Sequence, residues 1–132
     1  FAKLGVKVMI TELDINVLPS PKQLQGADVS LRFRSQAGLN PYPNGLPEAV
    51  QQQLAQRYAD LFAVFLKHRD SISRVTIWGV TDGDSWLNDW PIPGRTNHPL
   101  LFNREGKPKP AFYAVLQTAQ LKQSPTNSAT MR

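Results

Sequence analysis

Residues 5–15 read GVKVMITELDI, and this stretch decides the fold. Its β-branched and apolar residues predict a buried strand, and apolar residues on both faces are typical of a parallel strand covered on both sides. Because side chains alternate along a strand, one face is expected to carry Val6, Val8, Ile10, Glu12 and Asp14. The opposite face would carry Met9, Leu13 and Ile15. Two carboxylates at the C-terminal end of one face are unusual in a buried strand.

Outward from this strand, the chain twice follows the order strand, long loop, helix. After an irregular stretch over 19–46, Pro47 opens a predicted helix that continues to about His68. Apolar residues recur there at helical spacing, namely Val50, Leu54, Tyr58, Leu61 and Phe65. A second strand is predicted over 74–80, followed by a long loop over 81–108.

The last helix is predicted to begin near Pro110 and to bury Phe112, Val115, Leu116 and Ala119. Two βα units of this kind form parallel strands joined by a crossover helix, which is α/β architecture. Two parallel strands alone cannot form a sheet covered on both faces, so further strands are expected elsewhere. We assign 1–122 to this domain and expect the polar segment 123–132 to be disordered.

The composition limits the function classes. The chain has 132 residues, 41% of them hydrophobic, which suits one globular domain. It has no cysteine, which excludes disulfides and thiolate zinc sites, and no apolar run long enough to cross a membrane. Its 15 Lys and Arg against 10 Asp and Glu are scattered, so a solvated basic surface is favoured over nucleic-acid binding. Because the chain opens with Phe1 and has no signal peptide, we expect a processed or truncated product.

Glu12 and Asp14 are the first candidates for chemistry. Catalytic groups of a (β/α) barrel lie at the C-terminal ends of its strands. A glycosidase nucleophile must stay ionised, and a second acid can orient a neighbouring histidine. The alternative is structural, since a carboxylate at a strand end can pair with a buried arginine or cap a helix.

The tryptophans are the second signal. Trp78 is expected on the barrel side of its strand, and Trp86 and Trp90 follow in the loop above it. An indole offers a large apolar face on which the C–H face of a sugar ring can stack. The alternative is that these side chains only fill the core.

No metal site is predicted. The run Asp82-Gly83-Asp84-Ser85 is similar to the start of a calcium loop, but Leu87 and Pro93 stand where an EF-hand needs glycine and glutamate. His68 at a helix end and His98 beside a proline are not spaced as a metal pair, and both are expected to be structural.

Two segments, Ile10–Asp14 (ITELD) and Trp78–Leu87 (WGVTDGDSWL), carry a family resemblance. Pro99–Asn103 (PLLFN) and Lys107–Phe112 (KPKPAF) continue it. In this order the chain resembles the C-terminal quarter to third of a glycoside hydrolase family 10 xylanase, over about residues 4–120. The resemblance implies a TIM (β/α)8 barrel, of which this chain would supply roughly the last two βα units.

The resemblance also implies a function. The protein would be a secreted (extracellular or periplasmic) retaining endo-1,4-β-xylanase that cleaves internal bonds of xylan without a cofactor. Glu12 matches the nucleophile of the family, and Asp14 the aspartate that supports a histidine contacting it. Trp78 and Trp86 match tryptophans lining the non-reducing side of the cleaved bond, and Arg95 a neighbour of the substrate.

The departure from the family is one of extent. The acid/base glutamate, the histidine that Asp14 should hold and the first six strands have no counterpart here. A barrel of this kind needs about 250 residues, so the chain is expected to need an N-terminal part as partner and to be inactive alone. Two other interpretations stay open: a non-catalytic carbohydrate-binding remnant, or a barrel glycosidase acting on β-1,4-glucan or an aryl glycoside.

Overall fold

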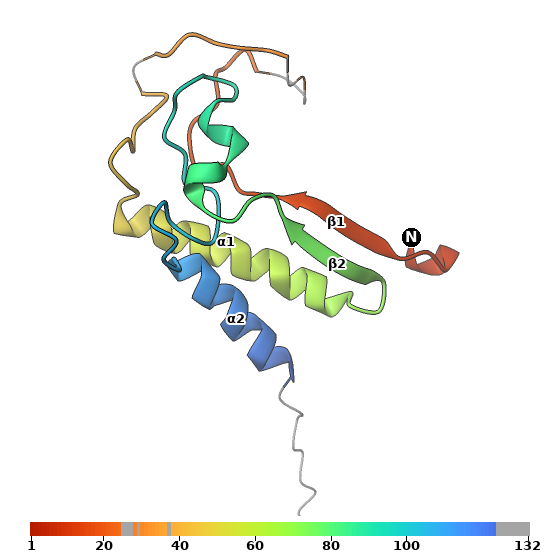
Figure 1. Cartoon of the computed structure of the whole chain (residues 1–132). Coiled ribbons are helices and arrows are strands. Elements are labelled where there is room, and N and C mark those ends of the chain that lie inside the picture. Colours follow the sequence, from red (N-terminus) through yellow and green to blue (C-terminus); the bar gives the residue numbers. More distant parts are fainter. Residues whose placement is uncertain (25–27, 29, 37, 124–132) are drawn as a thin grey trace, which may run out of the picture.

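The computed structural model describes residues 1–24, 28, 30–36 and 38–123. Its elements are η1 (Ala2–Leu4), β1 (Val8–Leu13), α1 (Glu48–Lys67), β2 (Ile72–Ile77), η2 (Asp82–Asp84), η3 (Trp86–Asn88) and α2 (Pro110–Gln123). The strands β1 and β2 are parallel neighbours, α1 lies along them, and α2 packs beside α1 (Figure 1). Two βα units are therefore present, as predicted.

The predicted boundaries hold best for the long helix. Pro47 is the N-cap of α1, and His68 is its C-cap, with a backbone N–H that donates to carbonyls of the last turn. Both strands end earlier than predicted, which lengthens the two irregular connections, and η2 and η3 interrupt the second one. The predicted disordered tail lies outside the described residues, except that Gln123 is the last residue of α2.

The strict alternation predicted along β1 holds for its first residues and fails after Ile10. Met9 pairs with Arg74, and both side chains are exposed. The next residue, Ile10, pairs with Val75, and both are partly buried. Ile10 therefore shares the burial of the helix-covered positions, whereas Met9 belongs to the open face.

A break in the ladder accounts for the failure of the alternation after Ile10. Between Ile10 and Leu13 the register shifts, so three steps along β1 match two along β2. Thr11 and Glu12 are consecutive exposed residues within this break. An extra residue of this kind moves the later side chains of the strand to the other face, and such bulges are frequent next to active sites.

The core forms where α1 and α2 meet the ends of the strands. Its buried members are Leu54, Ala55 and Tyr58 of α1 and Ala111 of α2, with Leu13 and Ile77 packed against them. Tyr58 is fully buried, and its hydroxyl donates to the carbonyl of Pro99 at 2.7 Å. Leu116, predicted to face inward, is instead 44% exposed.

A buried ion pair holds the second connection onto the helices. Asp82 is 1% exposed, and its two carboxylate oxygens accept from Nζ of Lys109 at 3.1 and 2.9 Å. The backbone N–H of Leu100 donates to the same carboxylate at 2.9 Å. Nζ of Lys109 also donates to the carbonyl of His98 at 2.9 Å. Burial lowers the pKa of Lys109, and the charge of Asp82 opposes that shift.

The strand face away from α1 is open. Met9 is 55% exposed and Trp78 47%, and Thr76 is also exposed. No described element lies over them (Figure 1). None of the helices in the described ranges has the length and apolarity that crossing a membrane requires.

We expect the 132-residue chain by itself to be poorly folded, because apolar side chains of a parallel sheet are stable only when covered. It should bind the dye ANS and show weak near-ultraviolet circular dichroism, as a loosely packed state does. A sharp cooperative unfolding transition without ANS binding would contradict this prediction.

We expect Asp82→Asn to lower the free energy of unfolding by about 3–5 kcal/mol, because it leaves the Lys109 ammonium buried without its counter-charge. Hydrogen exchange of the Leu100 amide should accelerate. The measurement is urea denaturation of the chain within a complete barrel, where further strands cover the open sheet face. Asp60→Asn, an exposed position on α1, is the matched control and should change stability by less than about 0.5 kcal/mol. Equal effects of the two substitutions would contradict the prediction.

Candidate active site

Glu12 lies near the carboxyl end of β1, within the register break, and its side chain is exposed. Its charge is near enough to Asp14 to raise the pKa of that carboxyl group. Both carboxylates lie at the carboxyl end of β1, where the first long connection begins. The structure thus brings the two predicted acids together at the edge where parallel α/β folds place their chemistry.

Asp14 is partly buried, and its partner is a tryptophan. The indole Nε1–H of Trp86 donates to Oδ2 of Asp14 at 2.8 Å, across 72 residues of sequence. Burial raises the pKa of Asp14, the hydrogen bond from Trp86 lowers it, and the charge of Glu12 raises it further. Neither histidine is placed to contact it, because His68 caps α1 and His98 contacts the carbonyl of Tyr42.

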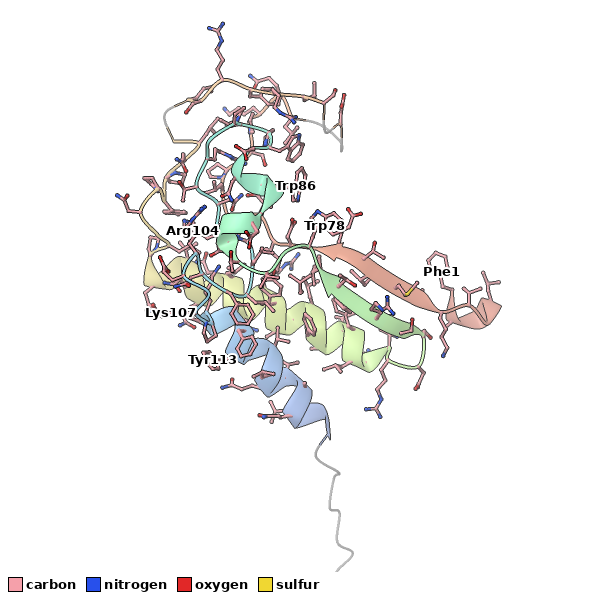
Figure 2. All side chains as sticks on the ribbon, in the orientation of Figure 1. Phe1, Trp78, Trp86, Arg104, Lys107 and Tyr113 are labelled. Atoms are coloured by element: carbon pink, nitrogen blue, oxygen red, sulfur yellow. The ribbon has the colours of Figure 1, made fainter. Side chains whose placement is uncertain are left out.

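Two tryptophans lie at the same end of the strands as these acids. Trp78 follows β2, and its backbone N–H donates to the carbonyl of Leu13 at 2.9 Å. Trp86 begins η3, whose N-cap Ser85 accepts from the Leu87 amide. Figure 2 shows Trp78 and Trp86 at the same end of the strand pair, away from α2. Both remain partly exposed, Trp86 by 38%, so part of each side chain is available to a ligand.

Trp90 lies behind Trp86. The two rings stack with centroids 4.9 Å apart and an interplanar angle of 29°. Trp90 is only partly exposed, and its Nε1 is buried with no acceptor in the described part of the chain. Trp90 therefore supports the neighbouring ring, whereas the sequence offered Trp86 and Trp90 alike as loop tryptophans on which a sugar could stack.

Arg95 is not brought to this group. It is 3% exposed, and its guanidinium donates to the carbonyls of Pro19 at 3.0 Å, Trp90 at 3.1 Å and Leu39 at 3.5 Å. Burial lowers its pKa. These contacts make Arg95 a tie between the two long connections, and its substrate contact stays a prediction that no contact of this structure supports.

Sequence reasoning missed a set of asparagines that joins the same connections. Asn97 is fully buried, and its Nδ2 donates to Oδ1 of Asn16 at 2.9 Å. Its backbone N–H donates to Oδ1 of Asn88 at 2.9 Å. Asn16 stands two residues after Asp14, so this bond fixes the chain just beyond the carboxylates. Nothing in the spacing of these asparagines marks the contact.

A cavity of about 510 Å³ lies elsewhere. It opens between the starts of α1 and α2, beside Gly45, His98, Arg104 and Lys109, and none of the candidate acids or exposed tryptophans lines it. Within the described ranges no three His, Cys, Asp or Glu side chains gather as metal ligands.

The known proteins that this chain resembles in sequence and in structure include xylanases. The chain is 48% identical over 117 residues to endo-1,4-beta-xylanase A of Xylanibacter ruminicola, covering 89% of this chain and 32% of that protein. It is 37% identical over 123 residues to a thermostable celloxylanase of Thermoclostridium stercorarium, covering 93% and 27%. A solved GH10 endoxylanase retrieved from a sugarcane soil metagenome matches with a TM-score of 0.83 and 54% identity, over 88% of this chain and 34% of that one.

The chain thus spans about a third of the length of the relatives it matches. The two parallel strands correspond to part of a TIM barrel, the fold of these structural relatives. The family model of glycosyl hydrolase family 10 matches residues 1–118, nearly everything the structure describes. With Glu12, Asp14 and the two exposed tryptophans inside that match, the chain belongs to glycosyl hydrolase family 10, as a C-terminal part of its barrel.

Proposed function

We propose that this chain supplies the nucleophile and part of the sugar-binding surface of a retaining endo-1,4-β-xylanase. The observation that carries the proposal is the exposed Glu12 carboxylate near the carboxyl end of β1, two residues before Asp14, whose carboxylate holds the exposed Trp86. The names of its relatives supply the substrate class. Because xylan is a polymer, we also propose that the enzyme is secreted.

Retention requires two carboxyl groups on opposite sides of the scissile bond, about 5–5.5 Å apart. Glu12 attacks the anomeric carbon and forms a covalent glycosyl ester, while an acid protonates the leaving oxygen. That acid then acts as the base that activates water. We place this second group on another strand of the barrel, outside this chain, so the present residues do not complete the reaction.

Trp78 and Trp86 have a different task. Their exposed faces bind the apolar C–H faces of xylose rings and hold the substrate against Glu12. Binding by stacking contributes to affinity and placement, and it moves no proton. A catalytic carboxylate beside two platforms suits a substrate that is a chain of sugars.

One relative's name favours a second substrate. The Thermoclostridium stercorarium protein is named a celloxylanase, so we keep a β-1,4-glucan as the second candidate for the same chemistry. Product release from soluble xylan and from soluble β-1,4-glucan, measured side by side, separates the two. Retention on insoluble xylan without any cleavage would favour the binding-remnant interpretation.

We expect Glu12→Gln to reduce turnover by about 10³-fold or more while leaving oligosaccharide binding largely intact, because the amide keeps the shape but cannot form the ester. The test uses a completed barrel, in which residues 1–118 replace the matching segment of the sugarcane-soil endoxylanase. Glu105→Gln, at an exposed loop position, is the control and should keep full activity.

Near-normal rates with Glu12→Gln would overturn the nucleophile assignment. Nuclear magnetic resonance of the first-formed product gives an independent check, because retention requires release of the β-anomer. Early release of the α-anomer would overturn the retaining mechanism.

We expect Trp86→Ala in the completed barrel to weaken binding of long xylo-oligosaccharides by about 1–2 kcal/mol, because one stacking face is lost. Small aryl glycosides that do not reach Trp86 should be affected less. Tyr113→Ala, which removes an exposed aromatic ring from α2 (Figure 2), should change neither. Titration calorimetry measures these affinities, and equal losses on short and long substrates would contradict the assignment.

A further inference from the structure

We propose that Asp14 is a positioning residue that fixes the Trp86 ring as a one-sided platform for the sugar. The carboxylate accepts the indole N–H at 2.8 Å and so connects the end of β1 with η3, two parts of the chain that are far apart in sequence. This inference rests on the proposed function, and it adds to Asp14 a task directed at the aromatic surface.

Trp86 needs such a restraint because of where it stands. It begins a three-residue turn of 3-10 helix in a long connection, and its ring is partly in solvent. A ring on a loop has free rotamers unless packing or a hydrogen bond selects one. Two contacts do so here. Trp90 covers one face of the ring, and Asp14 holds its polar edge.

These two contacts determine what the ring can bind. Because Trp90 stacks on one face, only the opposite face can receive a sugar. Because the N–H is engaged by Asp14, the ring has no donor left for a sugar hydroxyl. Trp86 therefore recognises the apolar face of a pyranose ring and no particular hydroxyl group. Its orientation is set at the polar edge of the ring by Asp14, two residues after Glu12.

A charged acceptor suits this task better than a neutral one. Hydrogen bonds to an ionised carboxylate are shorter and stronger than those to a neutral oxygen. Asp14 is partly buried beside the Glu12 charge, and both raise its pKa, so holding a carboxylate there costs stability. The interaction with Trp86 is the contact in this structure that offsets the cost.

The test is a double-mutant cycle in the completed barrel, carried out in the Glu12→Gln background so that binding is measured without turnover. Asp14→Ala should weaken binding of xylotetraose by about 5- to 10-fold when Trp86 is present. In the Trp86→Phe background, which lacks the N–H, Asp14→Ala should have less than a twofold further effect. Asp14→Asn, whose amide oxygen can still accept the N–H, should retain most of the affinity.

Two results would overturn the inference. One is an equal loss on Asp14→Ala in both backgrounds, and the other is a loss on Asp14→Asn as large as that on Asp14→Ala. The coupling is also measured without any sugar, because Asp14→Ala should move the indole ¹⁵N–¹H resonance of Trp86, and an unmoved resonance would count against it. If the completed barrel with Glu12 intact does not hydrolyse xylan, the proposed function fails, and the resonance still decides the role of Asp14.

Discussion

The buried Asp82 carboxylate is the group on which the arrangement of the loops depends. A carboxylate removed from water is unstable unless it is paired and hydrogen-bonded. Lys109 and the Leu100 amide meet that requirement from the far end of the same connection. The connection must therefore close on itself between the end of β2 and the start of α2. This closure carries η3, and with it Trp86, to the strand ends.

The strongest sequence signals were regular ones, and the structure confirms them. The helical spacing of apolar residues predicted α1 because one face of a helix meets the core every three to four residues. The order of elements predicted parallel strands, since a helix of this length joins strands by a crossover. The motif around Glu12 predicted a carboxylate at a strand end, and the residue lies there.

What sequence reasoning missed depends on contacts between distant segments. The period of two assumes an unbroken ladder, so it assigned Ile10 to the face of Glu12, whereas the register break separates them. The substrate contact of Arg95 came from the family resemblance alone and stays a prediction, but the hydrogen bonds that its guanidinium makes here were not predicted. Its partners are the backbone carbonyls of Pro19, in the other long connection, and of Trp90, in its own, and carbonyls leave no mark in a sequence. The pairing of Asp82 with Lys109 spans 27 residues and is equally invisible.

Asp14 shows why stability alone does not explain this site. A polar neutral side chain could accept the Trp86 N–H without placing a second negative charge beside Glu12. Proteins keep such unfavourable arrangements where function needs them and compensate elsewhere. Here the compensation comes from the N–H of Trp86 that the carboxylate accepts, and the bond between Asn16 and Asn97 fixes the chain just after Asp14. The rigid loop contacts thus allow an unfavourable pair of acids to persist at the open end of the strands.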